Sequence, residues 1–364
     1  MRYTIGQLAE IIDGDRGKNY PKQDEFYPQG YCLFLNTGNV TKEGFIFEEN
    51  QFIMKEKDEA LKKGKLKRGD IVYTTRGTVG NAGYYNSSVP YENVRINSGM
   101  VILRSNGEIV DARFLYQILK SEYYRPYFKQ YCTGSAQPQL PIKNFSQIYL
   151  NVPDIKTQHR IADILSVYDN LIENNQKQIK LLEEAAQRLY KEWFVDLRFP
   201  GHENTKIVDG VPEGWSRGLL KELISVNYGK DHKKAPDDGN IPVYGSGGLM
   251  RKCNKSLFSG EAVLIPRKGS LNNIMYVDET FWTVDTMFYA TMKQPHTAVF
   301  VYFFVKAFDM YSMNIGAAVP SMTAKILDAM DVVIPDKETL EKFDKLTKTY
   351  FNKIKTLQGQ NERL

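Results

Sequence analysis

The sequence predicts a protein of the α+β class, with two similar mixed α/β domains separated by two long antiparallel coiled-coil helices. Three observations support this: a long helical pattern without a breaking residue, a turn-rich hinge after it, and an internal repeat at a fixed offset. Together they indicate that the chain passes twice through the order domain then helix, with a pseudo-two-fold relation between its halves.

The first helix is predicted from apolar residues at alternating steps of four and three. These positions are Ile161, Leu165, Tyr168, Ile172, Asn175, Ile179, Leu182, Ala186, Leu189 and Trp193. A 3.5-residue period is typical of a coiled coil, whereas a helix inside a single core carries a wider apolar face. No proline or glycine occurs from Ile155 to Phe199, so at about 1.5 Å per residue the helix would span on the order of 65 Å. We therefore expect a strut between two bodies.

Asn175 is the polar residue in this apolar series. A polar side chain at a coiled-coil core position can fix the register of the helices at some cost in stability. We expect Asn175 to set the antiparallel register; the alternative is a helix that is exposed to solvent at this point.

Turn-forming residues mark the end of the long helix. Prolines and glycines recur from Phe199 to Trp215, and they rule out a continued helix. Short β-like runs, punctuated by glycine, asparagine and proline, fill the segments on either side. The predicted order is a first domain at residues 1–153, a first spacer helix at 154–198, a second domain at 199–335 and a shorter second spacer helix at 336–364.

Two tracts of the chain match each other without a gap. The tract that starts at Gly134 matches the tract that starts at Gly316, an offset of 182 residues that the helical pattern also follows. The second helix must then leave the second domain as the first helix leaves the first. Their apolar stripes can pack against each other only if the two helices are antiparallel.

A second pair of tracts extends the repeat upstream. The tract from Gly69 resembles the tract from Gly260. This alignment pairs Arg76 with Arg267 and leaves Lys268 as an extra residue. The repeat therefore covers the domains as well as the helices.

Composition narrows the class of protein. The 364 residues carry a formal charge of +5 and three cysteines, Cys32, Cys132 and Cys253, without metal-like spacing. Sparse cysteines in odd number favour a reducing compartment over a disulfide framework. No secretory leader and no long apolar run occur, so we expect a cytoplasmic protein with no membrane contact. The mild basic excess is compatible with a nucleic-acid partner without establishing one.

The sequence lacks motifs for catalysis. The Gly-rich stretch Tyr244–Gly248 has no following Lys-Ser/Thr pair, so we expect a turn rather than a phosphate loop. Paired carboxylates and a Ser/His arrangement do not stand out, although residues distant in sequence can still meet in space. The histidines have no metal-ligand spacing; they are His159, His202, His232 and His296. We expect a non-enzyme, without a metal or cofactor of its own, that directs the chemistry of another protein.

Two similar basic domains at a fixed separation suit a polymer with a regular repeat. Duplex DNA is such a polymer, and a protein with two-fold character binds two half-sites whose spacing its geometry sets. Base edges would specify the half-sites, and lysine or arginine contacts to phosphates would fix the register.

In the first domain, the leading candidate for DNA contact is the loop Thr74–Thr78, which joins an arginine to hydroxyl groups and a glycine. Arginine can donate two hydrogen bonds to guanine O6 and N7, and hydroxyl groups suit phosphates or base edges. The alternative is a turn whose arginine pairs with a local carboxylate. The candidates are Thr75, Arg76, Thr78, Arg95, Asn97, Gln137 and Lys143.

In the second domain, the matching loop begins at Arg267, and two lysine-rich segments precede it. The alternative for those segments is a solvated surface loop. The tract Ser135–Gln139 recurs as Ala317–Ser321, so we expect its prolines, Pro138 and Pro320, to serve the scaffold. The candidates are Lys230, Lys233, Lys234, Arg251, Arg267, Lys268, Ser270, Asn272 and Lys325.

Three motifs carry a resemblance that covers nearly the whole chain. They are a proline followed by Q-x-x-I-A-x-x-L at the helix start (Pro153, Gln158, Ile161, Ala162, Leu165), WFVDLRFPG at the helix end, and P-x-G-W at Pro212–Trp215. With these motifs the chain resembles the DNA-specificity subunit of type I restriction-modification systems. It departs from that pattern at Thr157, where an acidic residue is usual, and in its shorter second helix.

The resemblance implies two target-recognition domains, each of which binds one part of a bipartite double-stranded DNA target. It implies that the helices set the spacer and dock two DNA-methyltransferase subunits, with ATP-driven restriction subunits added in the full complex. Catalysis and its cofactors, S-adenosylmethionine, ATP and Mg²⁺, would belong to those partners.

Two other functions remain open from the sequence. The same two-domain shape could bind proteins as a scaffold without reading DNA. A DNA-cleaving or DNA-modifying enzyme with an unrecognised site is the third possibility. A scaffold would show no preference for any DNA sequence, and an enzyme would act on DNA without a partner.

Overall fold

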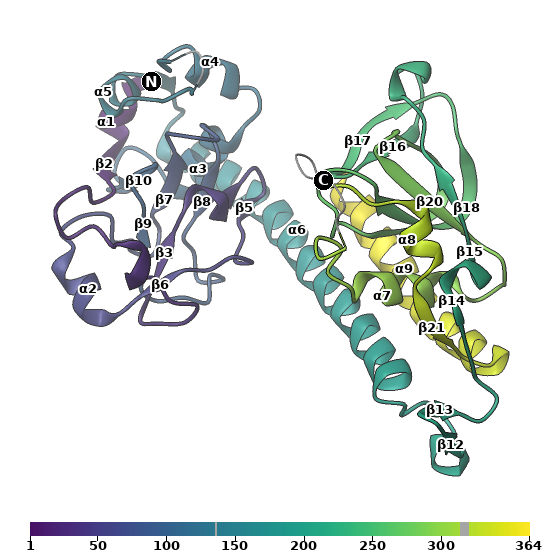
Figure 1. Ribbon diagram of the computed structural model, residues 1–364. Helices are drawn as coiled ribbons and strands as arrows, with labels where there is room; N and C mark the ends of the chain where they lie inside the picture. The colour runs from purple at the N-terminus through teal and green to yellow at the C-terminus, as the bar shows by residue number, and fades with distance from the viewer. Residues whose placement is uncertain (135–136, 314–319) are drawn as a thin grey trace. The chain divides into compact units, whose positions relative to one another are not determined.

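The structure is a computed structural model that describes residues 1–134, 137–313 and 320–364 (Figure 1). It divides into two compact units, Met1–Leu171 and Ile172–Leu364. The division falls within the long helix α6 (Ile155–Tyr190), which is continuous.

Unit 1 is built around a four-stranded antiparallel sheet with the order β2-β10-β7-β8. Its strands are β2 (Ala9–Asp13), β10 (Met100–Ser105), β7 (Ile71–Thr74) and β8 (Ala82–Tyr84). Successive side chains of a strand point to opposite faces of the sheet, and here both faces are buried in a core. Val101 and Leu103 join the core under α3 (Ala112–Lys120), whereas Met100 and Ile102 join the core shared with a second, three-stranded sheet.

The remaining elements of unit 1 are short. The three-stranded sheet has the order β6-β3-β9, and β1 pairs with β11. The bounds are β1 (Arg2–Thr4), α1 (Ile5–Leu8), η1 (Gln23–Glu25), β3 (Cys32–Leu35), η2 (Thr37–Asn39), β4 (Val40–Thr41), β5 (Gly44–Phe45), β6 (Phe52–Ile53), α2 (Lys55–Ala60), β9 (Val94–Ile96), α4 (Arg125–Lys129), α5 (Ile142–Ser146) and β11 (Tyr149–Asn151).

Unit 2 is built around a six-stranded sheet with the order β15-β20-β18-β19-β16-β17. Its strands are β15 (Ile224–Tyr228), β16 (Ile241–Gly245), β17 (Gly248–Cys253), β18 (Phe258–Pro266), β19 (Met275–Thr283) and β20 (Met287–Met292). Helix α7 (Ala298–Lys306) packs on one face together with the end of α6 and the start of α9 (Lys337–Asn361). The other elements are a π-helical turn η3 (Lys191–Val195), η4 (His202–Asn204), β12 (Ile207–Val208), β13 (Val211–Pro212), β14 (Ser216–Leu219), η5 (Leu220–Glu222), η6 (His232–Lys234), α8 (Ala324–Asp328) and β21 (Asp331–Ile334).

The predicted repeat is confirmed by the strand pairing. Strands β2, β10, β7 and β8 of unit 1 correspond to β15, β20, β18 and β19 of unit 2, in the same order and all antiparallel. The cap at the start of one short helix of each unit, α1 and η5, also recurs. The Thr4 N–H donates to Gln7 Oε1 and the Leu219 N–H donates to Glu222 Oε1, both at 2.8 Å. The two units therefore share one plan.

The register of these strands corrects the upstream alignment. Thr74 lies opposite Met100 in unit 1, and Pro266 lies opposite Met287 in unit 2. Thr74 therefore corresponds to Pro266, so Arg76 corresponds to Lys268 and not to Arg267. The sequence alignment was wrong by one residue because it matched identical letters, whereas the hydrogen-bonded register decides which side chains occupy equivalent places.

Both long helices begin with the same cap. Asp154 Oδ1 accepts the N–H of Thr157 at 3.0 Å, and the Thr157 hydroxyl donates to Asp154 Oδ2 at 2.7 Å. Asp336 and Thr339 repeat these contacts at 2.9 and 2.8 Å. An aspartate at this position satisfies N–H groups that have no partner within the helix. Thr157, the departure from the family pattern, thus has a defined role in the cap.

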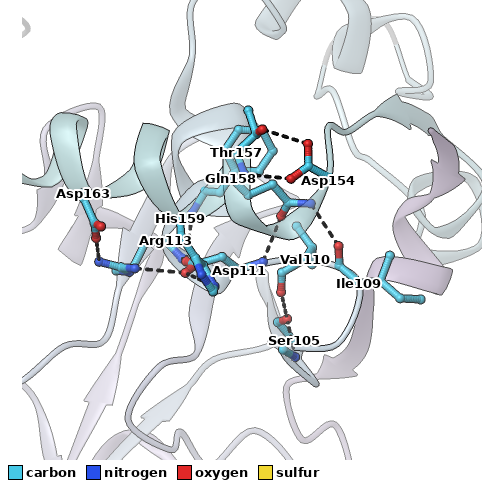
Figure 2. Close-up of polar contacts among 12 residues, drawn as sticks. Ser105, Ile109, Val110, Asp111, Arg113, Asp154, Thr157, Gln158, His159 and Asp163 are labelled. Carbon is cyan, nitrogen blue, oxygen red and sulfur yellow. Dashed lines mark hydrogen bonds and ion pairs between the residues drawn. The ribbon is translucent and has the colours of Figure 1, made fainter.

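The helix start is locked into unit 1 by Gln158, which is fully buried. Its amide donates to the Ile109 carbonyl and accepts the Asp111 N–H, both at 3.0 Å (Figure 2). It also donates to the Pro153 carbonyl at 2.9 Å. Further along, Asp163 and Asp169 pair with basic residues of α3, Arg113 and Lys120 respectively. Helix α6 is therefore tied to unit 1 over several turns.

In unit 2, the later part of α6 packs antiparallel to α9. Asn175 Nδ2 donates to Asn361 Oδ1 at 2.8 Å, near the end of α9. Phe194, just after α6, lies 4.8 Å from Phe343 near the start of α9, measured between ring centroids. Asn175 is 2% exposed, so the polar residue of the apolar series is buried and bridges the two helices.

Helix α9 is anchored by a polar network of several side chains, whereas α6 is anchored by Gln158. The Asp344 carboxylate is buried on α9, and it lies 2.7 Å from His296 Nδ1 and 3.0 Å from Lys348 Nζ. Lys348 also pairs with Glu261 of β18 at 3.1 Å, and Glu261 accepts the Tyr276 hydroxyl at 2.6 Å. Burial alone lowers the pKa of Lys348, but the bonds to Asp344 and Glu261 outweigh it and raise the pKa.

The P-x-G-W motif joins the hinge to the same helix. Trp215 is buried against Phe199, with ring centroids 4.8 Å apart. Its indole Nε1 donates to Asp336 Oδ2 at 2.8 Å. One carboxylate therefore caps α9 and holds the tryptophan that follows the hinge.

The Asp336 cap predicts an acid-sensitive contribution to stability. Burial alone raises the pKa of Asp336, but hydrogen bonds from Thr339 and Trp215 outweigh it and lower the pKa in the folded state. The contribution is therefore complete above the unfolded pKa of about 3.9 and is lost as the pH falls through the lower folded pKa. We expect Asp336→Asn to lower the free energy of unfolding by about 1 kcal/mol at pH 7, because an amide nitrogen replaces one of the two oxygens that accept hydrogen bonds from Thr339 and Trp215, and to flatten its decline below pH ~4.

Thermal unfolding of the full chain between pH 3 and 7 measures this, with Asp331→Asn at an exposed carboxylate as the matched control. If stability falls with decreasing pH to the same extent in Asp336→Asn and in the unsubstituted protein, the acid sensitivity does not come from Asp336.

Candidate nucleic-acid interface

Three segments of unit 1 meet at the loop after β7. The N–H groups of Thr75 and Arg76 both donate to the Gly99 carbonyl, at 2.9 and 3.1 Å. On the other side, the Leu140 N–H donates to the Thr75 carbonyl at 2.9 Å, and Arg76 is bridged to Gln139. The predicted loop is thereby placed beside the segments that carry two other candidates, Asn97 and Gln137.

Glycine is required where this loop turns. Gly77 has a φ of 68°, a left-handed conformation that side chains rarely adopt. The turn reverses the chain directly after Arg76 and before the exposed Thr78. Thr75 differs from Arg76 and Thr78, because it is buried and its hydroxyl donates to the Gly99 carbonyl at 3.1 Å. Thr75 therefore supports the loop from inside.

Arg95 is removed from the candidates by its burial. Its guanidinium is 5% exposed and lies 2.5 Å from Asp58 Oδ1, an aspartate that is itself buried. Its other nitrogens donate to the carbonyls of Lys63, Asp58 and Leu61 at 2.6, 2.7 and 3.0 Å. A side chain used in this way holds α2 and the loop after it to β9 and does not face DNA. Sequence patterns could not predict this pairing, because Asp58 lies 37 residues before Arg95 in the chain.

Two polar residues that the sequence did not single out join the unit 1 cluster. Arg16 Nη2 donates to the Ser98 carbonyl at 3.2 Å and remains partly exposed. Thr37 lies against Gly99, where an added Cβ would come within 2.8 Å of its methyl group. Only the folded chain brings them to the Ser98–Gly99 segment that holds the loop, so spacing along the sequence could not have found them.

The corresponding loop of unit 2 follows β18. The N–H groups of Arg267 and Lys268 both donate to the Thr286 carbonyl, at 2.8 and 3.2 Å. The Met322 N–H donates to the Arg267 carbonyl at 2.9 Å, and Lys268 is bridged to Ser321. Gly269 then takes a φ of 87°. The loop is the same construction as the one at Arg76.

The side chains of this loop have different surroundings. Arg267 lies over the Tyr228 ring, 5.5 Å from its centroid, and donates to the Asp285 carbonyl at 3.2 Å. Lys268 and Ser270 are exposed. Asn272 is bound on both sides, because its amide donates to Asp309 and its oxygen accepts the Met310 N–H. Asn272 therefore braces the loop, although it was predicted as a DNA contact.

The lysine-rich segments lie at the edge of this cluster. The Gly229 N–H donates to the Met287 carbonyl at 3.0 Å, which places Lys230 near the strand end that supports Lys268. Lys230 itself is exposed, as are the other lysines of the prediction, Lys233, Lys234, Lys143 and Lys325. Arg251 is instead half-buried and donates to the carbonyls of His232 and Ala235 and to Asp237, so it braces the segment.

In the Gly-rich stretch Tyr244–Gly248, the predicted turn is formed by Ser246 and Gly247, and the other residues belong to the paired strands β16 and β17. The turn lies beside the candidate loop, since the Ser246 carbonyl accepts the Asn273 amide at 2.9 Å and an added Cβ on Gly269 would come within 2.8 Å of Ser246 Oγ. Of the recurring tract, residues 135, 136 and 317–319 lie outside the described residues.

Cofactor and membrane features were sought over the described ranges. Across residues 1–134, 137–313 and 320–364, no cluster of three or more His, Cys, Asp or Glu side chains could hold a metal ion. Over the same ranges, no helix combines the length and apolar character needed to cross a bilayer.

The sequence matches the family described as "Type I restriction modification DNA specificity domain" over residues 1–184 and 212–364. The chain belongs to this family. The two matched ranges each contain one of the repeated loops described above. The predicted family resemblance is thereby confirmed.

Individual relatives agree with the family assignment. The Type I restriction enzyme HindI specificity subunit of Haemophilus influenzae is 31% identical over 194 residues, covering 53% of this chain and 42% of that protein. The MjaIX specificity subunit of Methanocaldococcus jannaschii is 23% identical over 347 residues, covering 83% of this chain and 76% of that protein. The chain thus spans less than half of the HindI subunit and about three quarters of the MjaIX subunit.

The fold is shared with a solved structure. The crystal structure of a Type-I restriction-modification system S subunit from M. genitalium has a TM-score of 0.61 and 17% sequence identity, covering 100% of this chain and 92% of that chain. At this identity the likeness concerns the fold alone, and it agrees with the predicted α+β architecture.

Burial of Arg95 predicts a structural role that a stability measurement can separate from DNA binding. Arg95→Met leaves the buried Asp58 carboxylate with Lys65 as its remaining ion-pair partner among the described residues. We expect a loss of about 3 kcal/mol in the free energy of unfolding, because the buried Asp58 carboxylate loses one of its two cationic partners and three backbone carbonyls lose their donor.

Denaturant unfolding of the full chain measures this loss. The matched control is Arg76→Met, which we expect to change stability by less than about 0.5 kcal/mol. Full stability in Arg95→Met, combined with loss of DNA binding, would restore Arg95 as a DNA contact.

Proposed function

We propose that this chain is the DNA-specificity subunit of a type I restriction-modification complex, in which each unit binds one half of a bipartite duplex target. Membership of the specificity family supports the proposal. The observation that carries it is the loop that is built twice, at Arg76 and at Lys268, on matching backbone hydrogen bonds. A chain that presents one basic loop in each of two similar domains is suited to two half-sites.

The groups around each loop are suited to DNA. In unit 1, Arg76, Thr78 and Arg16 offer guanidinium and hydroxyl donors close to the amide groups of Asn97 and Gln137. In unit 2, Lys268 and Ser270 are exposed beside Lys230. Lysine and arginine neutralise phosphates, and the donors of arginine, amides and hydroxyls match base edges. We propose that these residues form the DNA-contacting surface, with Lys233, Lys234, Lys143 and Lys325 as further phosphate contacts.

The helices would set the distance between half-sites. We propose target-recognition domains at residues 1–153 and 199–335, with spacer helices at 154–198 and 336–364. Two observations support a stiff spacer: α6 is continuous from Ile155 to Tyr190, and Gln158 and Tyr190, near its two ends, are buried. A helix held at both ends has little freedom to bend, so its length would determine the spacer.

Exposed apolar residues on α6 support a second role for the helix. Ile164, Val167 and Leu181 are 60%, 65% and 63% exposed. Exposed apolar side chains that gather on one element are typical of a protein–protein contact. We propose that they dock two DNA-methyltransferase subunits, to which restriction subunits are added. Catalysis, with S-adenosylmethionine, ATP and Mg²⁺, would belong to these partners, in the cytoplasm where the DNA lies.

Mapping of DNA methylation tests the proposed function. We expect a genome that expresses this chain together with its methyltransferase to carry methylated adenines at one bipartite motif, with two short specified parts and an unspecified spacer of fixed length. Cells with the methyltransferase alone are the control. Methylation that is the same without this chain would leave the protein-binding scaffold as the better account.

Insertion into α6 tests the role of the helix. Seven residues inserted between Leu171 and Ile172 leave the Asn175–Asn361 contact in place and add about 10 Å and nearly two whole turns. We expect the methylated motif to gain about three base pairs of spacer, at 3.4 Å per base pair. The unsubstituted chain, expressed in the same cells, is the control. Unchanged spacing in the seven-residue variant would contradict the proposed role of α6.

A further inference from the structure

The two repeated loops can be superimposed residue by residue through their hydrogen bonds. In each loop, two successive N–H groups donate to one carbonyl, that of Gly99 in unit 1 and that of Thr286 in unit 2. The first residue of each pair also accepts an N–H from the later tract, at 2.9 Å in both units. By these bonds Thr75 corresponds to Arg267, and Arg76 corresponds to Lys268.

The first position of each pair has an internal role. Thr75 is 3% exposed, and its hydroxyl donates to the Gly99 carbonyl at 3.1 Å. Arg267 is half-buried, covers the Tyr228 ring and donates to the Asp285 carbonyl. Although the residue types differ, both side chains hold their loop to the neighbouring strand ends. Arg267 therefore has part of its guanidinium engaged within the unit.

The second position of each pair is available for a ligand. Among the described residues, neither the Arg76 guanidinium nor the Lys268 ammonium makes a hydrogen bond or an ion pair. Each side chain stands directly before a left-handed glycine, Gly77 with φ 68° and Gly269 with φ 87°. Arg76 is half-buried and Lys268 is exposed. An unpaired cation at such a turn is suited to an anionic or hydrogen-bonding partner.

We propose that Arg76 and Lys268 are the equivalent DNA-contacting residues of the two units, and that one contacts a base and the other a phosphate. This inference rests on the proposed function. Arg76 contacts the edge of a guanine in the half-site of unit 1, because its planar guanidinium can donate two hydrogen bonds to O6 and N7 at once. Lys268 contacts a phosphate in the half-site of unit 2, because an ammonium group on a flexible stem acts as a point charge. Arg267, which the sequence matched with Arg76, is a positioning residue.

The chemistry of these two positions makes the half-sites unequal. A base contact discriminates one base pair from another, whereas a phosphate contact raises affinity for every sequence. At this position, unit 1 thus gains specificity for one base pair, whereas unit 2 gains affinity for DNA of any sequence. The specified bases of the second half-site must be read by other groups of unit 2, such as Ser270 or the turn at Ser246.

The experiment uses the full chain in complex with its methyltransferase partners, and the probes are duplexes that carry the mapped target with one base pair changed at a time. Arg76→Lys should lower the preference for guanine at one position of one half-site by about 5- to 100-fold and leave the other half-site unchanged. Arg267→Lys is the matched control, since a lysine can still lie over Tyr228; we expect its base preferences to match those of the unsubstituted chain.

Lys268→Gln is tested by its dependence on salt. We expect weaker binding by a similar factor for all probes, and a slope of log affinity against log salt that is smaller by about one. Thermal unfolding of each variant confirms that the fold is retained.

Three results would overturn the inference: an unchanged base profile in Arg76→Lys, a changed base profile in Arg267→Lys, or an unchanged salt slope in Lys268→Gln. If the unsubstituted complex shows no bipartite preference, the proposed function itself fails, and this is seen before any variant is compared.

Discussion

The buried amide of Gln158 is the contact on which the arrangement of helix and domain depends. At the first turn of the helix it binds two carbonyls and one N–H of unit 1. A buried amide that lost one of these partners would incur a desolvation cost of about 1–3 kcal/mol. The direction in which α6 leaves unit 1 is therefore fixed by hydrogen bonding, and ion pairs to α3 extend this control along the helix.

The second helix achieves the same result with other groups. Leu340 stands where the repeat has Gln158, and it is buried with Phe343 in the apolar core of unit 2. The polar fixing is supplied further along α9, where Asp344 and Lys348 are bound to His296 and Glu261. Two copies of one plan have thus kept the helix cap, Asp154 and Asp336, while their buried anchoring contacts have diverged.

The same distinction between shared backbone and divergent side chains applies to the loops. The hydrogen bonds to Gly99 and Thr286 are common to both units, because they hold the strand ends and the later tract together. The side chains of Arg76 and Lys268 are free to change, since among the described residues they take no part in these hydrogen bonds. An arginine in one unit and a lysine in the other can therefore occupy one backbone position and serve different chemistry.

Periodicity and repetition along the chain were enough to predict the long helix, the polar contact at Asn175, the antiparallel packing with the second helix and the duplicated plan. These features depend on local spacing, which the sequence states directly. The candidate site was predicted only in part: the loops at Arg76 and Lys268 were located, but the buried Arg95 and the bracing roles of Asn272 and Arg251 were missed. Tertiary structure decided these, and it also decided that Lys268 rather than Arg267 matches Arg76. Burial and hydrogen-bond register arise between segments far apart in the chain, so no pattern within one segment could contain them.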